Sequence, residues 1–93
     1  MDQKGDTVAE GDDIKKQWFD WFEEKYGRRI RRTIQGRVKN PVWSDDIIQE
    51  VYCRVWMYCD RMRTLEKKAL EVYLKDILRT AVADYFADRN SRL

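Results

Sequence analysis

The stretch Asp46-Ile-Ile-Gln-Glu-Val-Tyr-Cys-Arg-Val-Trp56 decides the fold class of this chain. Its apolar residues recur every three or four positions, which is the spacing of one face of an α-helix. Asp46, Gln49 and Glu50 group on another face of the same helix. A helix that only fills a core rarely needs two acids and an amide in its first turns. This polar face is therefore predicted to be a docking surface for a partner.

The same helical period continues before this stretch. It predicts a first helix that begins at Asp12 or Asp13 as N-cap and ends at Gly36 and the Asn40–Pro41 pair. Gly27 lies inside this helix, where it allows a bend or a break.

The second helix is predicted to begin at Ser44 as N-cap, with Trp43 packed on Ile48 as a hydrophobic staple. Residues 60–68 are predicted to be a loop, and the helical period returns over residues 70–86. No stretch shows the alternation of a strand. We therefore expect an all-α fold, a compact bundle of three to four helices.

The length of the chain and the distribution of its charged residues limit the possible domain organisation. The 93 residues make one domain, with residues 1–11 as a flexible acidic tail and residues 12–93 as the helical domain. The net charge is only +2, yet the segment of residues 28–39 is rich in basic residues and contains no acid. They are Arg28, Arg29, Arg31, Arg32, Arg37 and Lys39. This segregation indicates either a polyanionic or acidic partner or a solvated helix face.

The residue types argue against an enzyme. The sequence has no His, so the usual acid–base catalyst and the usual zinc ligand are both missing, and we expect no metal and no cofactor. Cys53 and Cys59 are expected to be reduced thiols on different helix faces. No apolar run is long enough to span a membrane, so we expect a cytoplasmic protein.

Three motifs resemble region 2 of the bacterial sigma factors, and specifically the extracytoplasmic-function (ECF) group. Asp46–Trp56 is similar to the family pattern Asp-Leu-Val-Gln-Glu-x-Phe-x-Arg-x-Trp. Tyr73-Leu-Lys-Asp-Ile-Leu-Arg-Thr-Ala-Val-Ala-Asp-Tyr85 is similar to Trp-Leu-x-x-Ile-Ala-Arg-Asn-x-x-x-Asp-Tyr, and Tyr26-Gly-Arg-Arg-Ile resembles Tyr-Gly-x-x-Leu of the first long helix. The two longer motifs stand in the family's order and at the family's separation.

The resemblance implies two binding surfaces. The residues that match the polymerase-binding motif are Asp46, Gln49, Glu50 and Arg54, and their implied partner is the clamp coiled coil of the largest subunit of core RNA polymerase. The loop and the third helix are implied to hold the non-template strand of the promoter's minus-ten element as a melted single strand. The residues implied to contact this DNA are Met62, Arg63, Lys67, Lys68, Lys75, Arg79, Thr80, Arg89 and Arg92.

The chain departs from the family pattern at the DNA surface. Thr80 replaces an Asn, Met62 stands where the loop commonly has an aromatic residue, and Phe86 to Asp88 precede the basic residues that usually follow Tyr85. These changes are predicted to weaken or retune DNA contact.

The chain ends where the linker to a region 4 helix-turn-helix domain would begin, so we expect an excised domain or a short sigma factor that lacks region 4. Two alternatives stay open. One is a sigma mimic or split-sigma subunit that binds an anti-sigma factor or a separate region 4-bearing partner, with little DNA binding. The other is a helical nucleic-acid-binding domain unrelated to transcription initiation.

Overall fold

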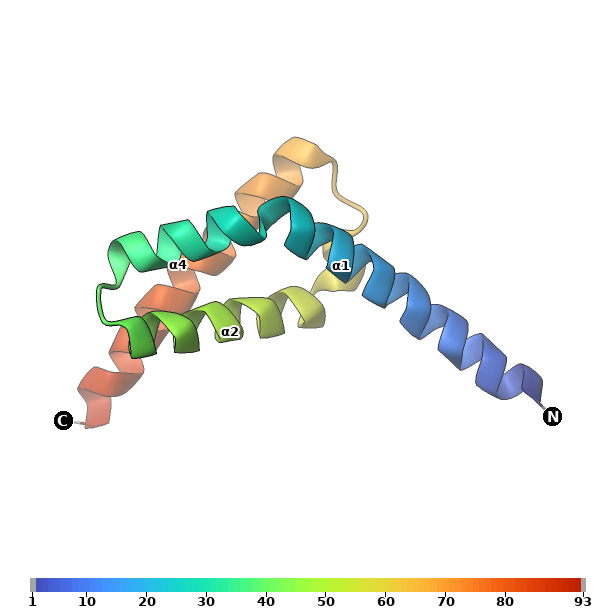
Figure 1. Cartoon of the computed structure of the whole chain (residues 1–93), viewed down its shortest axis with the longest axis horizontal. Helices are drawn as coiled ribbons and strands as arrows, with labels where there is room; N and C mark the ends of the chain where they lie inside the picture. The colour runs from blue at the N-terminus through green and yellow to red at the C-terminus, as the bar shows by residue number, and fades with distance from the viewer. Residues whose placement is uncertain (1, 93) are drawn as a thin grey trace.

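The computed structural model describes the backbone of residues 2–92 and the side chains of residues 13–89. Over this range the fold is all-α and has no strand, as the sequence predicted (Figure 1). The helices are α1 (Asp2–Arg37), α2 (Pro41–Met57), α3 (Cys59–Met62) and α4 (Lys67–Arg92).

The first helix is longer than predicted. The backbone of residues 2–11, which we expected to form a flexible tail, is helical and continues into α1. Asp12 and Asp13 therefore lie inside the helix, and the N-cap predicted there is wrong. Once a helix exists, each further residue adds a hydrogen bond at little cost, and acids are favourable near its positive N-terminal end.

The first helix ends at Arg37, before the Asn40–Pro41 pair, and this pair begins the next helix. The side-chain Oδ1 of Asn40 accepts hydrogen bonds from the backbone N–H groups of Val42 at 2.9 Å and Trp43 at 3.1 Å. Pro41 occupies the first helical turn, where its missing N–H costs nothing. Asn40 is thus the N-cap of α2.

Ser44 is therefore not the cap that we predicted. It is buried in the first turn of α2, where its hydroxyl donates to the carbonyl of Pro41 at 3.1 Å. The predicted staple between Trp43 and Ile48 is also wrong, because Trp43 lies inside the helix. Its ring packs edge-on against Phe86 of α4, with 5.9 Å between the ring centroids.

The predicted loop after α2 is shorter than expected. A turn at Tyr58 separates α2 from the short helix α3, and only residues 63–66 lack helical structure before α4. The Thr64 hydroxyl donates to the carbonyl of Arg61 at 2.7 Å and closes this turn.

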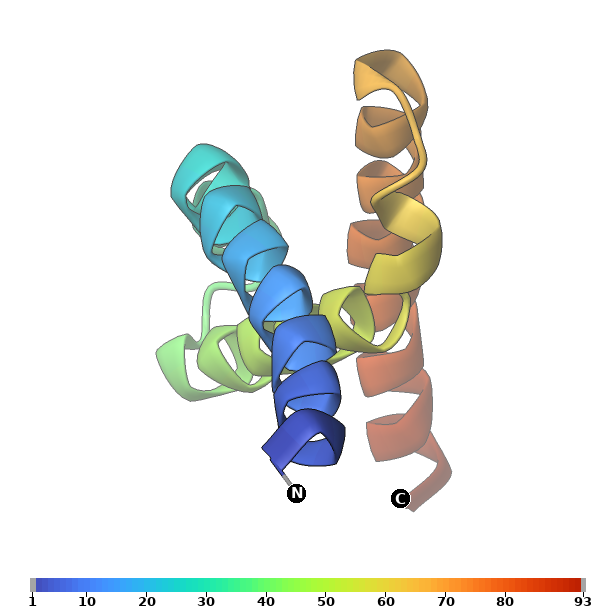
Figure 2. The same cartoon turned by 90° about the vertical axis from the view of Figure 1, so that its right-hand side faces the viewer.

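The core lies where α2 packs against both α1 and α4, which diverge from it on either side (Figure 2). The helices α1, α2 and α4 each contribute one apolar stripe at the predicted spacing. The largest fully buried side chains include Phe22, Ile30, Ile34, Ile47, Val51, Val55, Met62 and Leu74.

Gly27 continues α1 without a break, and its role is close packing between α1 and α2. A Cβ atom at this position would lie 3.0 Å from the Tyr52 hydroxyl oxygen, which is closer than a normal van der Waals contact. At Gly36 a Cβ atom would meet no other atom within 4 Å, so that position is open.

This packing predicts a coupling between Gly27 and Tyr52. Gly27→Ala alone should stabilise the fold little, because the helix propensity gain of about 1 kcal/mol is offset by displacement of the tyrosine ring. In a Tyr52→Phe background the full gain should appear in urea unfolding followed by circular dichroism. Gly36→Ala is the control and should have the same effect in both backgrounds; equal effects of Gly27→Ala in both would contradict the coupling.

Candidate functional site

The polar face of α2 is exposed, as its composition predicted. Asp46, Gln49 and Glu50 are all exposed and line one side of a shallow depression of about 440 Å³. Asp84 and Tyr85 of α4 line the opposite side. The Tyr85 hydroxyl donates to Oδ2 of Asp46 at 3.3 Å, so α4 orients the first acid of this face.

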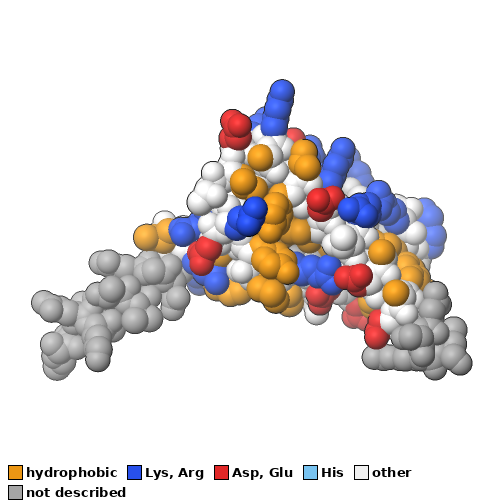
Figure 3. Space-filling model, turned by 180° about the vertical axis from the view of Figure 1, so that it is seen from behind, with side chains coloured by type: hydrophobic (Ala, Val, Ile, Leu, Met, Phe, Trp, Pro, Cys, Tyr) orange, Lys and Arg blue, Asp and Glu red, His pale blue; other side chains and the backbone are white. Residues whose placement is uncertain are grey.

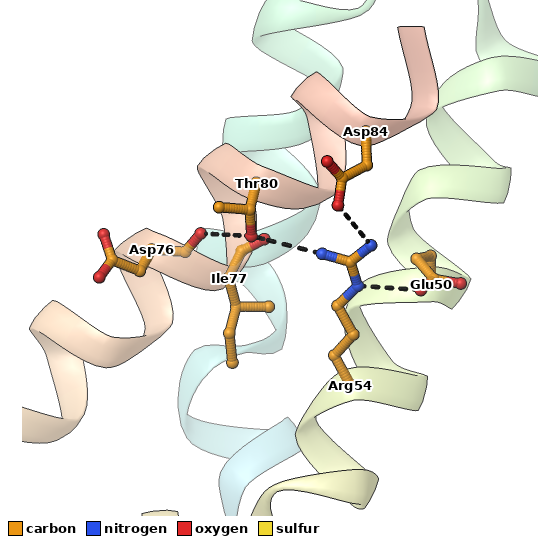
Figure 4. Close-up of polar contacts among 6 residues, drawn as sticks. All are labelled: Glu50, Arg54, Asp76, Ile77, Thr80 and Asp84. Carbon is orange, nitrogen blue, oxygen red and sulfur yellow. Dashed lines mark hydrogen bonds and ion pairs between the residues drawn. The ribbon is translucent and has the colours of Figure 1, made fainter. Parts of the chain in front are cut away.

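Arg54 connects this polar face to α4 (Figure 4). Its Nε donates to Oε2 of Glu50 at 2.9 Å, its Nη2 to Oδ2 of Asp84 at 3.1 Å, and its Nη1 to the hydroxyl of Thr80 at 3.3 Å. The hydrogen bond to Glu50 is the main cause of a raised Arg54 pKa. These three contacts fix the guanidinium between the two helices, and its bond to Glu50 holds that carboxylate in position.

The hydroxyl of Thr80 is engaged as well (Figure 4). It accepts from Arg54, and it lies 2.8 Å from the carbonyl of Asp76 and 3.3 Å from that of Ile77, to which it can donate. The Thr that replaces the family's Asn is thus built into the contact between α2 and α4.

A pocket next to Thr80 is lined by aromatic residues that the sequence motifs did not assign to a site. Tyr58 and Tyr73 lie edge to face with 6.4 Å between their ring centroids. Together with Asp76, Ile77 and Thr80 they line a depression of about 390 Å³. Tyr73, in α4, falls at the Trp position of the Tyr73–Tyr85 motif. Tyr58 belongs to no motif, and the turn after α2 places it beside Tyr73.

The loop residues predicted to contact DNA have different environments. Met62 is 1% exposed and packs in the core, so its side chain is not available to a ligand in this structure. The exposed Arg63 pairs with Asp60 at 3.5 Å. Lys67 and Lys68 are exposed at the start of α4.

The predicted DNA-contacting residues of α4 spread over much of its length. Lys75 is exposed, and Arg79 is exposed but paired with Asp76 at 3.1 Å. The guanidinium of Arg89 lies 4.1 Å from the ring centroid of Trp43, which is a cation–π contact. The side chain of Arg92 lies outside the described residues.

The two cysteines differ in environment. Cys53 is exposed and lines the docking depression, whereas Cys59 is buried. Burial is the main cause of a raised Cys59 pKa, so that thiol stays protonated at neutral pH.

In the described part of the chain, no helix is both long enough and apolar enough to cross a membrane.

Comparison with known protein families identifies the family of this chain. The family model described as sigma-70 region 2 matches residues 23–92, which span the second half of α1 and all of α2, α3 and α4. The chain belongs to the sigma-70 region 2 family. No match was found among curated proteins or among solved structures.

Membership in the sigma-70 region 2 family confirms the resemblance carried by the three sequence motifs. This family acts in transcription initiation, with core RNA polymerase and promoter DNA as its partners, and it is not an enzyme family. The alternative of a helical domain unrelated to transcription initiation is therefore set aside. The ECF group and the lack of region 4 are compatible with the match and stay expectations.

Proposed function

We propose that this domain docks on the clamp coiled coil of core RNA polymerase through α2 and holds the melted minus-ten strand on α4. The observation that carries the proposal is the Arg54 network. It joins Glu50 of the docking face to Thr80 and Asp84 of α4, so that one cation supports both surfaces.

The docking half rests on exposure and charge. Glu50 and Asp84 keep side-chain exposures of 51% and 66% although both bind Arg54, so negative charge faces solvent along the depression. A basic helical surface is the complementary partner, because opposed charges set association rate and register at an interface. Cys53 and Trp56 extend this exposed side of α2 with less polar surface.

The DNA half rests on the tyrosine pocket. An unpaired base that leaves the stack needs an aromatic surface and polar groups that reach its edges. Tyr58 and Tyr73 supply the rings, and the exposed carboxylate of Asp76 supplies an acceptor at the rim of the pocket. The exposed Arg79 of the same helix can neutralise a nearby phosphate.

Three contacts favour the alternative, a sigma mimic or split-sigma subunit with little DNA binding. Arg79 is paired with Asp76, the Thr80 hydroxyl is bound to Arg54, and Arg89 stacks on Trp43. In this alternative the docking face binds an anti-sigma factor or polymerase, and a separate partner supplies the DNA contacts.

The docking surface is tested by replacing Asp46, Gln49 and Glu50 together with Ala. Recovery of core RNA polymerase in a pull-down should fall by about tenfold or more, because the complementary charges that fix the interface are lost. The helical circular-dichroism signal should not change, because all three side chains are exposed.

A matched control exists on α1. Gln17, Asp20 and Glu24 are exposed and have the same chemistry, one amide and two carboxylates. Their triple Ala variant should recover polymerase as the wild type does. Undiminished recovery with the α2 variant, or an equal loss with the α1 variant, would refute docking through α2.

A further inference from the structure

A second groove lies between the C-terminal half of α1 and the N-terminal half of α4. It has a volume of about 620 Å³. Arg29, Thr33 and Arg37 line it from α1, and Lys68 and Lys75 line it from α4. Its apolar lining comes from Val72, Leu74 and Leu78. The motifs assign no function to the groove as a whole, although Lys68 and Lys75 are among the residues that the resemblance implied to contact the melted strand.

The cations of the groove form two rows. Arg29, Thr33 and Arg37 recur at every fourth position, so they follow one stripe of α1, and the two arginines are about 12 Å apart along the helix axis. Lys68 and Lys75 are separated by about two turns of α4. Cations that are spread along two walls suit a linear polyanion, whereas a small anion needs donors that converge on one point.

These cations are not neutralised within the part of the chain that the structure describes. Arg54, Arg63 and Arg79 each form an ion pair, but Arg29, Arg37, Lys68 and Lys75 form none among residues 13–89. The one acid that lines the groove, Glu71, lies 3.3 Å from the hydroxyl of Tyr26, which donates to it. Seen from the α4 side, Lys and Arg side chains, with some Asp and Glu side chains among them, flank a central apolar strip (Figure 3).

The lining of the groove also shows which part of a nucleic acid fits it. It contains no aromatic ring, so unstacked bases find no stacking surface there. In a duplex the bases are stacked inside and only the sugar–phosphate backbone reaches a protein groove of this kind. The tyrosine pocket uses a different face of α4, that of Tyr73, Asp76 and Thr80.

We propose that the α1–α4 groove binds the phosphate backbone of double-stranded DNA through Arg29, Arg37, Lys68 and Lys75. This inference rests on the proposed function, because it adds a duplex site beside the single-strand site of α4. It also gives a role to Arg29 and Arg37, two arginines of the basic segment of α1.

The test is Arg29→Gln with Arg37→Gln in the full chain, measured by fluorescence anisotropy with a short labelled promoter duplex. The affinity for the duplex should fall by about tenfold, and the slope of log affinity against log salt should decrease by about 2, since each lost phosphate contact removes about 0.9. The matched control is Arg28→Gln with Arg32→Gln, on another side of the same helix. It removes the same charge and should change duplex affinity by less than about threefold at 0.1 M salt, where charges more than about 10 Å away are screened.

A single strand of the same sequence separates the two DNA sites. The Arg29 and Arg37 variant should bind it about as tightly as the wild type does, and it should still pull down core polymerase, because α2 is unchanged. Equal losses of duplex affinity in both arginine pairs would show diffuse charge attraction and overturn the proposal. Undiminished duplex binding, as expected if the groove held an acidic protein segment, would overturn it too, and so would a wild-type chain that binds no duplex. Failure of polymerase docking would instead show in the α2 variant.

Discussion

Phe22→Ala is expected to lower the free energy of unfolding by about 3–5 kcal/mol. Phe22 is 0% exposed in the core, and its ring packs against Trp18 at 5.2 Å and Tyr26 at 5.0 Å between ring centroids. Removal of the ring leaves a cavity that the surrounding helices fill only in part. A domain of this size has a total stability of about 5–10 kcal/mol, so the variant should lose about half of it.

Urea unfolding followed by circular dichroism measures this loss, and Trp21→Ala is the control. Trp21 is the neighbouring aromatic residue but is 45% exposed, so its replacement should cost only about 1 kcal/mol. If the two substitutions lowered the free energy of unfolding equally, the face of α1 that carries Phe22 would not be the one that packs in the core.

The periodic features of the fold were predictable from the sequence. Ile30, Ile34, Val51 and Leu74 follow the 3.6-residue period, and all are buried. Burial of one apolar stripe per helix is the dominant stabilising term, so the sequence pattern that encodes it survives into the structure. The same pattern predicts that the polar face of α2 lies at the surface, where the structure has it.

The helix ends and one loop residue were not predictable in the same way. Asn40 and Ser44 are both good N-caps, and the choice of Asn40 depends on Pro41, which fits the first turn of a helix as well as it ends one. Met62 was assigned to a DNA-facing loop, but the short helix α3 turns it into the core. A helix of this length has no period long enough to detect in the sequence.

The hydrogen-bond network around Arg54 could not be predicted from the sequence either. Glu50 and Arg54 are four residues apart, which predicts a pair on one helix. Thr80 and Asp84 come from another helix, however, and no local spacing shows that they meet the same guanidinium. Side chains gathered from elements far apart in sequence depend on the packing angle of the helices, and only the three-dimensional structure gives it.

Tyr73→Ala is expected to weaken binding of a single-stranded minus-ten oligonucleotide by about tenfold or more, since a stacked base contributes about 1–3 kcal/mol. The half-buried ring of Tyr73 lines the pocket opposite Tyr58 and next to Thr80. Anisotropy with the polymerase-bound domain measures the effect.

Tyr73→Phe keeps the ring and removes only the hydroxyl, so it should retain affinity within about threefold if stacking is the main interaction. Trp21→Ala serves as the second control, because Trp21 is an exposed aromatic residue of α1 that lines neither the docking depression nor the tyrosine pocket. A wild-type affinity in Tyr73→Ala would mean that no base enters the pocket. Since the docking face on α2 is untouched by this change, polymerase binding would then persist without single-strand recognition, which is the behaviour expected of the mimic.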